Sequence, residues 1–424
     1  MRKTNVTILL VFALSANAQL PDHTYKPNIA SVKLFRYGDM YSYPILKLNS
    51  NDQLQLLFDD LDADAKTYYY TYQLCNADWS PSSLQPYDYI RGFQTTRISA
   101  YRYSSIAFTH YTNYQAVIPD PNCVPTRSGN YLLKVFLNSD TSKLAFTKRF
   151  LVIDNKVSIS AQLLQPFNGQ LYRTHQRVQV GITTNSEVRS VSPQDLKVVI
   201  LQNNIWTTAL FSDRPTIFRG NYYEYSDEAT TTFEGGKEWR WIDLRSLRLM
   251  SDRMQRMTDS GKSVHVFVKP DGDRENQTYL YYNDLDGIYT IESTDNTNPY
   301  WQGDYAYVHF IFIPPGQRAF EGRSVYLFGE LTNYSVDQSS RMIFNPDKGA
   351  YEKTLFLKQG YYNYCYVTMT DRSSEGRNIS FENTEGNYSG TENTYTVLVY
   401  FRPFGARADE LIGYATANSV LQGQ

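Results

Sequence analysis

Alternating apolar and polar side chains constrain this chain most, because a two-residue period is the pattern of a β-strand with one buried face. Such alternation covers residues 131–137 and 263–269. The residues that share a face are Tyr131, Leu133, Val135 and Leu137 in the first segment, and Val264, Val266 and Val268 in the second. Residues 306–313 and 394–401 are apolar on both faces, which is typical of central strands in a sandwich.

Turn-forming residues separate these segments. Turns are expected at Ser128-Gly129-Asn130, Pro270-Asp271-Gly272, Asp286-Gly287 and Gly360. The chain also contains 37 Tyr and 22 Phe, whose flat rings pack well on a pleated, half-buried surface. Many short strands with such turns predict an all-β protein made of β-sandwich domains.

One segment has a helical period instead. Between residues 244 and 257, apolar side chains recur at intervals of three and four, and Gly261 follows as a plausible helix stop. These side chains are Leu244, Leu247, Met250, Met254 and Met257. We therefore predict one short helix near 244–257, with a methionine stripe that packs into a core and does not hold a cofactor.

The start of the chain has the pattern of an export signal. A basic start at Arg2 and Lys3 precedes an apolar run over residues 6–14. Ala16-Asn17-Ala18 then fits the small-x-small cleavage rule, so we expect a signal peptide over 1–18 and cleavage between Ala18 and Gln19. Because Gln19 is not a cysteine, we expect no lipid anchor at the new N-terminus.

Length and charge fit an exported protein of several domains. The 406 residues after the predicted cleavage correspond to two or three domains of about 150 residues each. Polar, turn-rich stretches near 153–157 and 292–303 predict domains at 19–155, 156–295 and 296–424. The formal charge is −2 for the full chain, and the loss of Arg2 and Lys3 makes it −4. We expect no nucleic-acid partner and no direct membrane insertion, because no block of like charge and no long apolar run follows residue 18.

Three cysteines leave two interpretations open. Cys75 and Cys123 can form a disulfide within one domain in an oxidising compartment, whereas an odd number cannot all pair within one molecule. Alternatively, Cys75, Cys123 and Cys365 are all small buried apolar groups, and this second interpretation is slightly favoured.

The sequence contains none of the common catalytic motifs. It has no Gly-x-Ser-x-Gly elbow, no His-Glu-x-x-His zinc helix and no Walker loop. The histidines have no ligand-like spacing; they are His23, His110, His175, His265 and His309. We therefore predict no catalytic, cofactor-binding or metal-binding residues, and no enzyme activity.

Three acidic segments partly match the start of a calcium loop. Asp60, Asp62 and Asp64 alternate like the start of such a loop, but Ala65 stands where Gly is needed and Thr71 where a bidentate Glu is needed. The segments 284–287 and 271–273 are shorter still. All three are interpreted as solvated turns, the last of them in a hairpin.

An alternative hypothesis is that the protein binds or processes carbohydrate. The two catalytic carboxylates of a glycosidase are defined by their distance in the fold, so a single sequence does not reveal such a pair. The tryptophans offer aromatic rings for sugar stacking; they are Trp79, Trp206, Trp239, Trp241 and Trp301. Buried rings are the default interpretation for Trp239 and Trp241.

A succession of short segments resembles a known family. In order, the segments are LFDDL (57–61), YYTYQLCNADW (69–79), Gly92-Phe93, SGNYLLKVF (128–136), EWRWIDLRSL (238–247), NDLDGIYTI (283–291) and DYAYVHFIF (304–312). From about residue 29 to the end, the chain resembles the plug proteins of the type IX secretion system of Bacteroidetes. The positions that carry the resemblance are Asp59, Cys75, Asn76, Asp78, Trp79, Gly92, Gly129, Tyr131, Asp243, Asp286 and Gly287.

The resemblance implies a periplasmic protein without catalytic activity, located at the inner side of the outer membrane. It implies that the protein binds and seals the periplasmic mouth of the giant outer-membrane β-barrel translocon. It supplies no catalytic residue, no cofactor and no contact residue for that interface.

The last third also resembles an early-set sandwich of the glycogen-binding-module type. VYLFGELTNY (325–334) matches the opening strand of those modules, with Gly329 and Asn333 in place. Tyr334 stands where a sugar-stacking Trp is expected. The combined expectation is tandem immunoglobulin-like or early-set β-sandwich domains with one short helix, and the alternative function is an envelope glycan-binding or glycan-processing protein.

Overall fold

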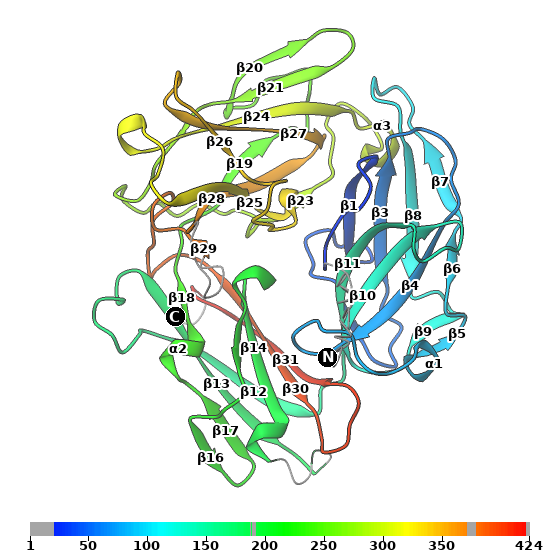
Figure 1. The fold of residues 1–424 in the computed structure, drawn as a ribbon, viewed down its shortest axis with the longest axis vertical. Helices are drawn as coiled ribbons and strands as arrows, with labels where there is room; N and C mark the ends of the chain where they lie inside the picture. Colours follow the sequence, from blue (N-terminus) through cyan, green and yellow to red (C-terminus); the bar gives the residue numbers. More distant parts are fainter. Residues whose placement is uncertain (1–20, 187, 189–191, 371–378, 421–424) are drawn as a thin grey trace, which may run out of the picture.

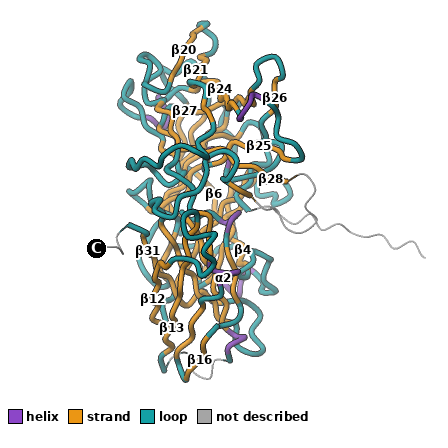
Figure 2. The backbone as a smooth tube through the Cα atoms, turned by 90° about the vertical axis from the view of Figure 1, so that its left-hand side faces the viewer, coloured by secondary structure: helices purple, strands orange, loops and turns teal. Residues whose placement is uncertain are grey.

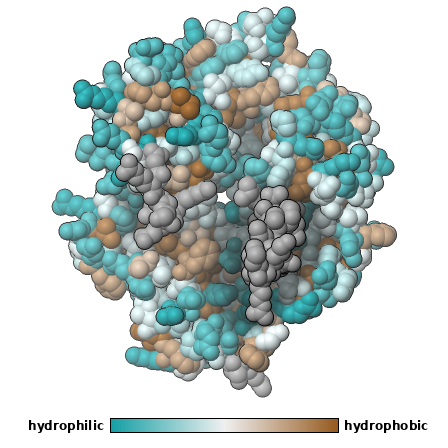
Figure 3. Space-filling view, viewed as in Figure 1, coloured by the Kyte–Doolittle hydropathy of each residue, from teal (hydrophilic) through white to brown (hydrophobic). Residues whose placement is uncertain are grey.

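The computed structural model describes residues 21–186, 188, 192–370 and 379–420. These residues form an all-β protein of three lobes arranged around a common junction (Figure 1). Turned by 90°, the molecule is thin, with β16 near one end and β20 near the other (Figure 2). Polar and apolar residues are interspersed on the face shown in Figure 3. The predicted all-β sandwich fold is therefore confirmed.

The N-terminal lobe, residues 21–153, is a sandwich of two antiparallel sheets with one short parallel edge. One sheet has the order β1 (Ile29–Arg36), β3 (Leu54–Asp60), β8 (Thr112–Ile118), β7 (Ala100–Tyr103). The other has the order β2 (Ile45–Lys47), β11 (Leu144–Ile153), β10 (Gly129–Leu137), β4 (Tyr68–Cys75), β6 (Thr96–Ile98). A small ribbon of β5 (Ile90–Gly92) and β9 (Cys123–Pro125) lies beside α1 (Pro86–Tyr89).

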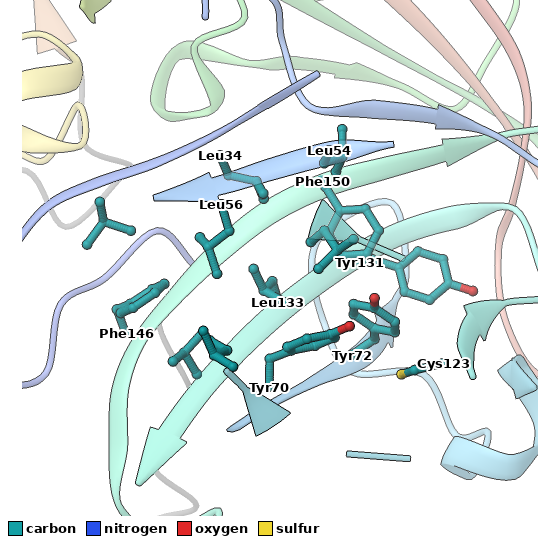
Figure 4. Close-up of a cluster of buried hydrophobic side chains, with 14 of the residues drawn as sticks. Leu34, Leu54, Leu56, Tyr70, Tyr72, Cys123, Tyr131, Leu133, Phe146 and Phe150 are labelled. Atoms are coloured by element: carbon teal, nitrogen blue, oxygen red, sulfur yellow. The ribbon is translucent and has the colours of Figure 1, made fainter. Parts of the chain in front are cut away.

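The core of this lobe follows from the alternation in the sequence. Tyr131, Leu133 and Val135 are fully buried. In the same sheet, Leu133 lies beside Tyr72 of β4 and Tyr131 beside Phe150 of β11 (Figure 4). The rings of Tyr131 and Phe150 stack with centroids 5.2 Å apart. The abundance of tyrosine therefore reflects a sheet surface packed with rings, whose geometry adds stability beyond the buried area.

The middle lobe combines residues 157–234 with residues 394–418. One sheet has the order β12 (Val157–Leu164), β13 (His175–Thr184), β17 (Tyr222–Tyr225), β16 (Ile217–Arg219), and β18 (Thr232–Glu234) also pairs with β13. The other has the order β15 (Leu210–Ser212), β14 (Leu196–Gln202), β30 (Thr394–Phe401), β31 (Glu410–Asn418). The short helix α2 (Glu228–Thr231) precedes β18.

The inserted lobe, residues 240–380, lies between β18 and β30 in the chain. Its first sheet contains β19 (Arg240–Asp243), β28 (Tyr361–Thr370) and β23 (Tyr289–Thr290), and β25 (Arg323–Phe328) and β29 (Ile379–Ser380) also pair with β28. Its second has the order β20 (Met254–Asp259), β21 (Val264–Val268), β24 (Tyr305–Ile313), β27 (Ala350–Lys358), β26 (Ile343–Asn345), and β22 (Asp271–Gly272) pairs with β24. The helix α3 (Pro299–Gln302) precedes β24.

The sheets do not follow the expected division of the chain. β14 pairs with β30 over Leu196–Gln202 and Tyr395–Phe401, so the end of the chain completes the middle lobe. β19 to β23, which precede residue 296, belong to the inserted lobe. The ranges 156–295 and 296–424 therefore describe chain order and not the sheets.

The helix predicted near 244–257 is wrong. Leu244 to Arg253 form a loop, and Met254 begins β20, which pairs with β21. Asp295 accepts hydrogen bonds from the Leu247 amide at 2.9 Å and the Ser246 hydroxyl at 2.8 Å, which satisfies the loop backbone. The helical period was therefore overridden by strand pairing, and Met250 is exposed.

Candidate functional site: the junction of three lobes

Apolar side chains join the N-terminal and middle lobes. Leu151 of β11 packs in one fully buried cluster with Leu398 of β30 and Leu411 of β31. Beside this cluster, the hydroxyl of Tyr400 donates to Asn130 Oδ1 at 2.6 Å. Burial of this kind stabilises by about 25 cal/mol per Å² of apolar surface, so the contact resists separation of the lobes.

A buried ion pair joins the N-terminal and inserted lobes. Lys358 at the end of β27 donates from Nζ to Asp59 Oδ2 in β3, and both side chains are fully buried. Asp59 also accepts from the Tyr305 hydroxyl at 2.6 Å and from Asn113 Nδ2 at 2.7 Å. Burial lowers the pKa of Lys358, and the charge of Asp59 opposes that shift.

A second ion pair repeats this arrangement on β1. Lys33 Nζ lies 2.6 Å from Glu330 Oε2 and donates to the Tyr289 carbonyl at 2.8 Å. Burial lowers the pKa of Lys33, and Glu330 opposes that effect. Removal of one partner from a buried ion pair lowers the free energy of unfolding by about 3–5 kcal/mol, so both pairs hold the lobes in a fixed register.

Aromatic rings enclose an arginine between the N-terminal and middle lobes. Trp79 and Trp206 pack edge to face with centroids 4.9 Å apart. The Arg149 guanidinium lies 4.9 Å from the Trp79 centroid and 5.5 Å from the Trp206 centroid. Asp22 pairs with the same guanidinium at 3.1 Å.

A cavity of about 100 Å³ lies where the three lobes meet. Lys33, Lys148 and Arg149 contribute to its wall from the N-terminal lobe. Asn204 and Trp206 come from the middle lobe, and the inserted lobe supplies Glu330, Asn333 and Tyr334. The junction is therefore a ligand-sized space with mixed aromatic and charged walls.

The inserted lobe contains an ion network of its own. Arg240 pairs with Asp271 at 2.9 Å and with Glu385 at 3.0 Å, and Arg274 pairs with Glu385 at 2.6 Å. The two arginines hold the pKa of Glu385 at about 2, against the opposing effect of burial. Asp271 is buried, and it is not the solvated hairpin turn expected from the sequence, because β22 pairs parallel to β24.

Three carboxyl groups have raised pKa values near the loop before β23. Burial raises the pKa of Glu238 to about 7, of Asp284 to about 6 and of Asp286 to about 8, and the nearby Glu392 carboxylate adds to each shift. Asp284 accepts hydrogen bonds from the Trp239 and Asp286 amides. The expected solvated turn is therefore partly buried here.

The family-motif positions lie mainly at lobe contacts and tight turns. Asp59 and Trp79 lie at the junction described above, and Asn76 accepts a hydrogen bond from Arg402 of the middle lobe. Asp78 caps the turn at Ser80, and Asp243 pairs with Arg245 at 2.7 Å.

The remaining motif positions are glycines and buried groups. A Cβ on Gly92 would lie 2.2 Å from the Asn122 carbonyl oxygen, and one on Gly287 would lie 2.7 Å from the Trp239 ring. Gly129 and Asp286 also have positive φ. Cys75 and Tyr131 belong to the buried part of the N-terminal lobe. Ala18 and Gln19 lie outside the described residues.

Other candidate residues are engaged within the chain. Cys75, Cys123 and Cys365 are all buried free thiols. Lys66 pairs with all three carboxylates of the calcium-like segment 60–64, and Asp60 is fully buried. The described residues contain no group of three or more His, Cys, Asp or Glu side chains that could hold a metal ion.

The tryptophan rings pack against other parts of the chain. Trp239 is buried, and the other four are half-buried. Trp241 packs against Tyr282, and Trp301 lies under Arg102. Each ring therefore already contacts protein.

Sequence reasoning missed the buried lysines. Lys33, Lys148 and Lys358 occur within apolar strand sequences, and all three are buried at the junction. A lysine inside such a run is a usable signal, because a buried ammonium needs a partner from elsewhere in the fold.

Exposed apolar side chains mark a different part of the N-terminal lobe. They lie on α1, β7 and neighbouring loops, and are Tyr87, Phe93, Tyr101, Tyr103, Ile106 and Phe108. β5 and β6 lie on the side of this lobe that faces away from the other two lobes (Figure 1), whereas Arg102 of β7 reaches Trp301 of the inserted lobe. None of the described helices is long and apolar enough to cross a membrane.

Comparison with known proteins identifies the family. Residues 29–154, which correspond to the N-terminal lobe, match the family model described as type 9 secretion system plug protein 1st domain. A crystal structure of a hypothetical protein from Parabacteroides merdae is 31% identical, with a TM-score of 0.88 over 94% of this chain and 99% of that chain. Residues 29–154, and with them the N-terminal lobe, belong to the type IX secretion system plug protein family. No curated protein matches it.

Membership of the plug family associates the protein with type IX secretion and with a structural role in the envelope. The family match covers the lobe that carries the exposed aromatic side chains. The similar crystal structure covers all three lobes, so their arrangement is shared with that protein.

Proposed function

We propose that this plug-family protein is a non-catalytic periplasmic plug that binds and seals the periplasmic mouth of the type IX outer-membrane translocon barrel. The observation that carries the proposal is the locking of three lobes by buried contacts, of which the pair of Lys358 and Asp59 is the clearest. A cap must keep its shape against a wide opening, and a thin, broad body of this kind meets that need (Figure 2).

The contact face in this proposal is the exposed aromatic side of the N-terminal lobe. Ile106, Tyr87 and Phe93 are 74%, 71% and 69% exposed. Aromatic and Arg side chains are enriched where protein interfaces gain most of their binding energy, and Arg91 and Arg97 lie exposed on the adjacent β5 and β6. The loop after β7 also bonds to the inserted lobe, through the Ser105 and Phe108 amides. The side chains of Tyr87, Phe93 and Ile106 stay exposed and are available as anchors.

The experiment compares two triple variants in cells that lack the native gene. Tyr87→Ser/Phe93→Ser/Ile106→Ser removes the anchors, and Phe211→Ser/Phe218→Ser/Phe404→Ser removes exposed rings of the middle lobe as a matched control. We expect the first variant to lose co-purification with the barrel and to let small dyes enter, while its melting temperature stays unchanged. The control variant is expected to keep both functions.

Two outcomes would contradict the proposal. Repeated recovery of the unmodified protein from native envelopes without a large outer-membrane barrel would contradict the proposed partner. Equal dye entry in cells with and without the gene would contradict the sealing role.

A further inference from the structure

The charged groups around the junction cavity do not balance. Lys33, Lys148 and Arg149 line it together with Asp22 and Glu330, so three cations face two carboxylates. Lys33 pairs with Glu330, and Arg149 pairs with Asp22. Lys148 is therefore the cation left over.

Lys148 is buried without a carboxylate. Its side chain is 8% exposed, and its Nζ donates to the amide oxygen of Asn333 at 2.8 Å. Within the part of the chain that the structure describes, no Asp or Glu lies within ion-pair distance of Lys148. A buried ammonium is costly unless an anion or several hydrogen bonds compensate it.

Two residues that line the cavity also carry a buried polar atom with no hydrogen-bond partner among the described residues. These atoms, the Tyr334 hydroxyl and Arg149 Nε, lie beneath the accessible surface. More than nine-tenths of buried polar groups in proteins have a partner, so a cluster of three under-used donors at one cavity requires an explanation. The Lys148 ammonium and Arg149 Nε can only donate hydrogen bonds, whereas the Tyr334 hydroxyl can donate or accept one.

The rest of the wall is aromatic and apolar. Trp206, Tyr43 and Met40 line the same space, and the Trp206 indole donates to the Tyr43 hydroxyl at 2.6 Å. Binding sites for small organic molecules combine such apolar walls with a few placed polar groups. A volume of about 100 Å³ is smaller than the ~150 Å³ of a cavity that holds benzene, so it suits an acid of two or three carbons or a small C-terminal residue.

We propose that the junction cavity binds an organic carboxylate, with its charge on Lys148 and its apolar part against the aromatic wall. The source is either a free small acid or the C-terminal carboxylate of a polypeptide, since both present the same group. Because all three lobes line the cavity, an occupant would tie them together and raise the melting temperature by mass action. The inference does not rest on the sealing role, since it concerns the isolated protein.

The test measures binding to the full mature protein by calorimetry and by thermal shift. Propionate is the small-acid probe, and propionamide is its uncharged counterpart of similar shape. A short peptide that ends in a free Ala carboxylate is compared with the same peptide amidated. We expect at least one carboxylate to bind and to raise the melting temperature, and its amide to bind about ten- to a hundredfold more weakly.

Variants locate the site. Lys148→Met keeps the apolar stem and is expected to reduce affinity about tenfold or more, Lys148→Arg to restore most of it, and Tyr334→Phe to reduce it less. Lys143→Met, on the exposed β10–β11 turn, is the control and is expected to bind normally.

Equal affinity for carboxylate and amide would overturn the proposal, as would failure of both carboxylates to bind the unmodified protein. The comparison of probes needs no variant, so it decides the matter even if Lys148→Met does not fold. Preference for the peptide or for propionate identifies the source, and either result supports the carboxylate site.

Discussion

Lys358 and Asp59 form a fully buried ion pair between residues 299 positions apart in the chain, with Nζ 2.5 Å from Oδ2. The pair links the end of β27 in the inserted lobe to β3 in the N-terminal lobe. Water reaches neither side chain, so each charge is compensated only by its protein partners. The contact therefore fixes how the two lobes are placed against each other.

Removing one partner should therefore be costly. We expect Lys358→Met to lower the free energy of unfolding by about 3–5 kcal/mol, because Asp59 is left buried without its cation. Urea unfolding measures this change. The double variant Lys358→Met/Asp59→Asn should recover part of the loss, and a double variant as unstable as the sum of both single variants would contradict the pairing.

The turn at Asp286 and Gly287 should depend on the missing side chain of glycine. Gly287 has φ +85° and lies against the Trp239 ring, so Gly287→Ala combines backbone strain with a clash. We expect a loss of more than about 2 kcal/mol in thermal or urea unfolding. Gly220→Ala is the matched control, with φ +62° and open space around it, and should cost only about 1 kcal/mol.

Stability should fall as the pH rises through the pKa of Asp286. Burial, reinforced by Glu392, raises this pKa to about 8, well above the unfolded value near ~4. The folded protein then holds a proton that the unfolded chain has lost, so the free energy of unfolding decreases between about pH 5 and pH 8.

Urea unfolding across this pH range measures the effect. Asp286→Asn should flatten the decline relative to the unmodified protein, whereas Asp213→Asn on the surface should not. Identical pH profiles for the unmodified protein and Asp286→Asn would rule out this origin of the slope.

All three cysteines should behave as buried thiols. Burial raises the pKa of Cys75 to about 12 and of Cys123 to about 11, so neither forms a reactive thiolate near neutral pH. We expect almost no reaction with a thiol reagent in the folded protein and three thiols per chain after unfolding in guanidinium. A count of one after unfolding would show that Cys75 and Cys123 are joined.

The sequence by itself determined where many strands lie and which side chains are buried in them. Val264, Val266 and Val268 share a buried face, and residues 306–313 form a strand between two others, as their patterns predicted. These features are local, because a two-residue period encodes which face of a strand is apolar wherever its partner comes from. The ordered motifs also indicate the family, because they are properties of the sequence.

The tertiary structure alone decided which strands pair and which polar groups meet. Nothing local to β14 specifies β30 as its partner, about 200 residues later. The sequence pattern therefore does not predict that a lobe is inserted between these two strands. Met254 begins a strand despite the helical period at 244–257, because it pairs with β21. The meeting of Lys358 with Asp59, and the placing of Lys148 beside a cavity, depend on three lobes closing together, since burial and electrostatic partners are properties of the folded whole.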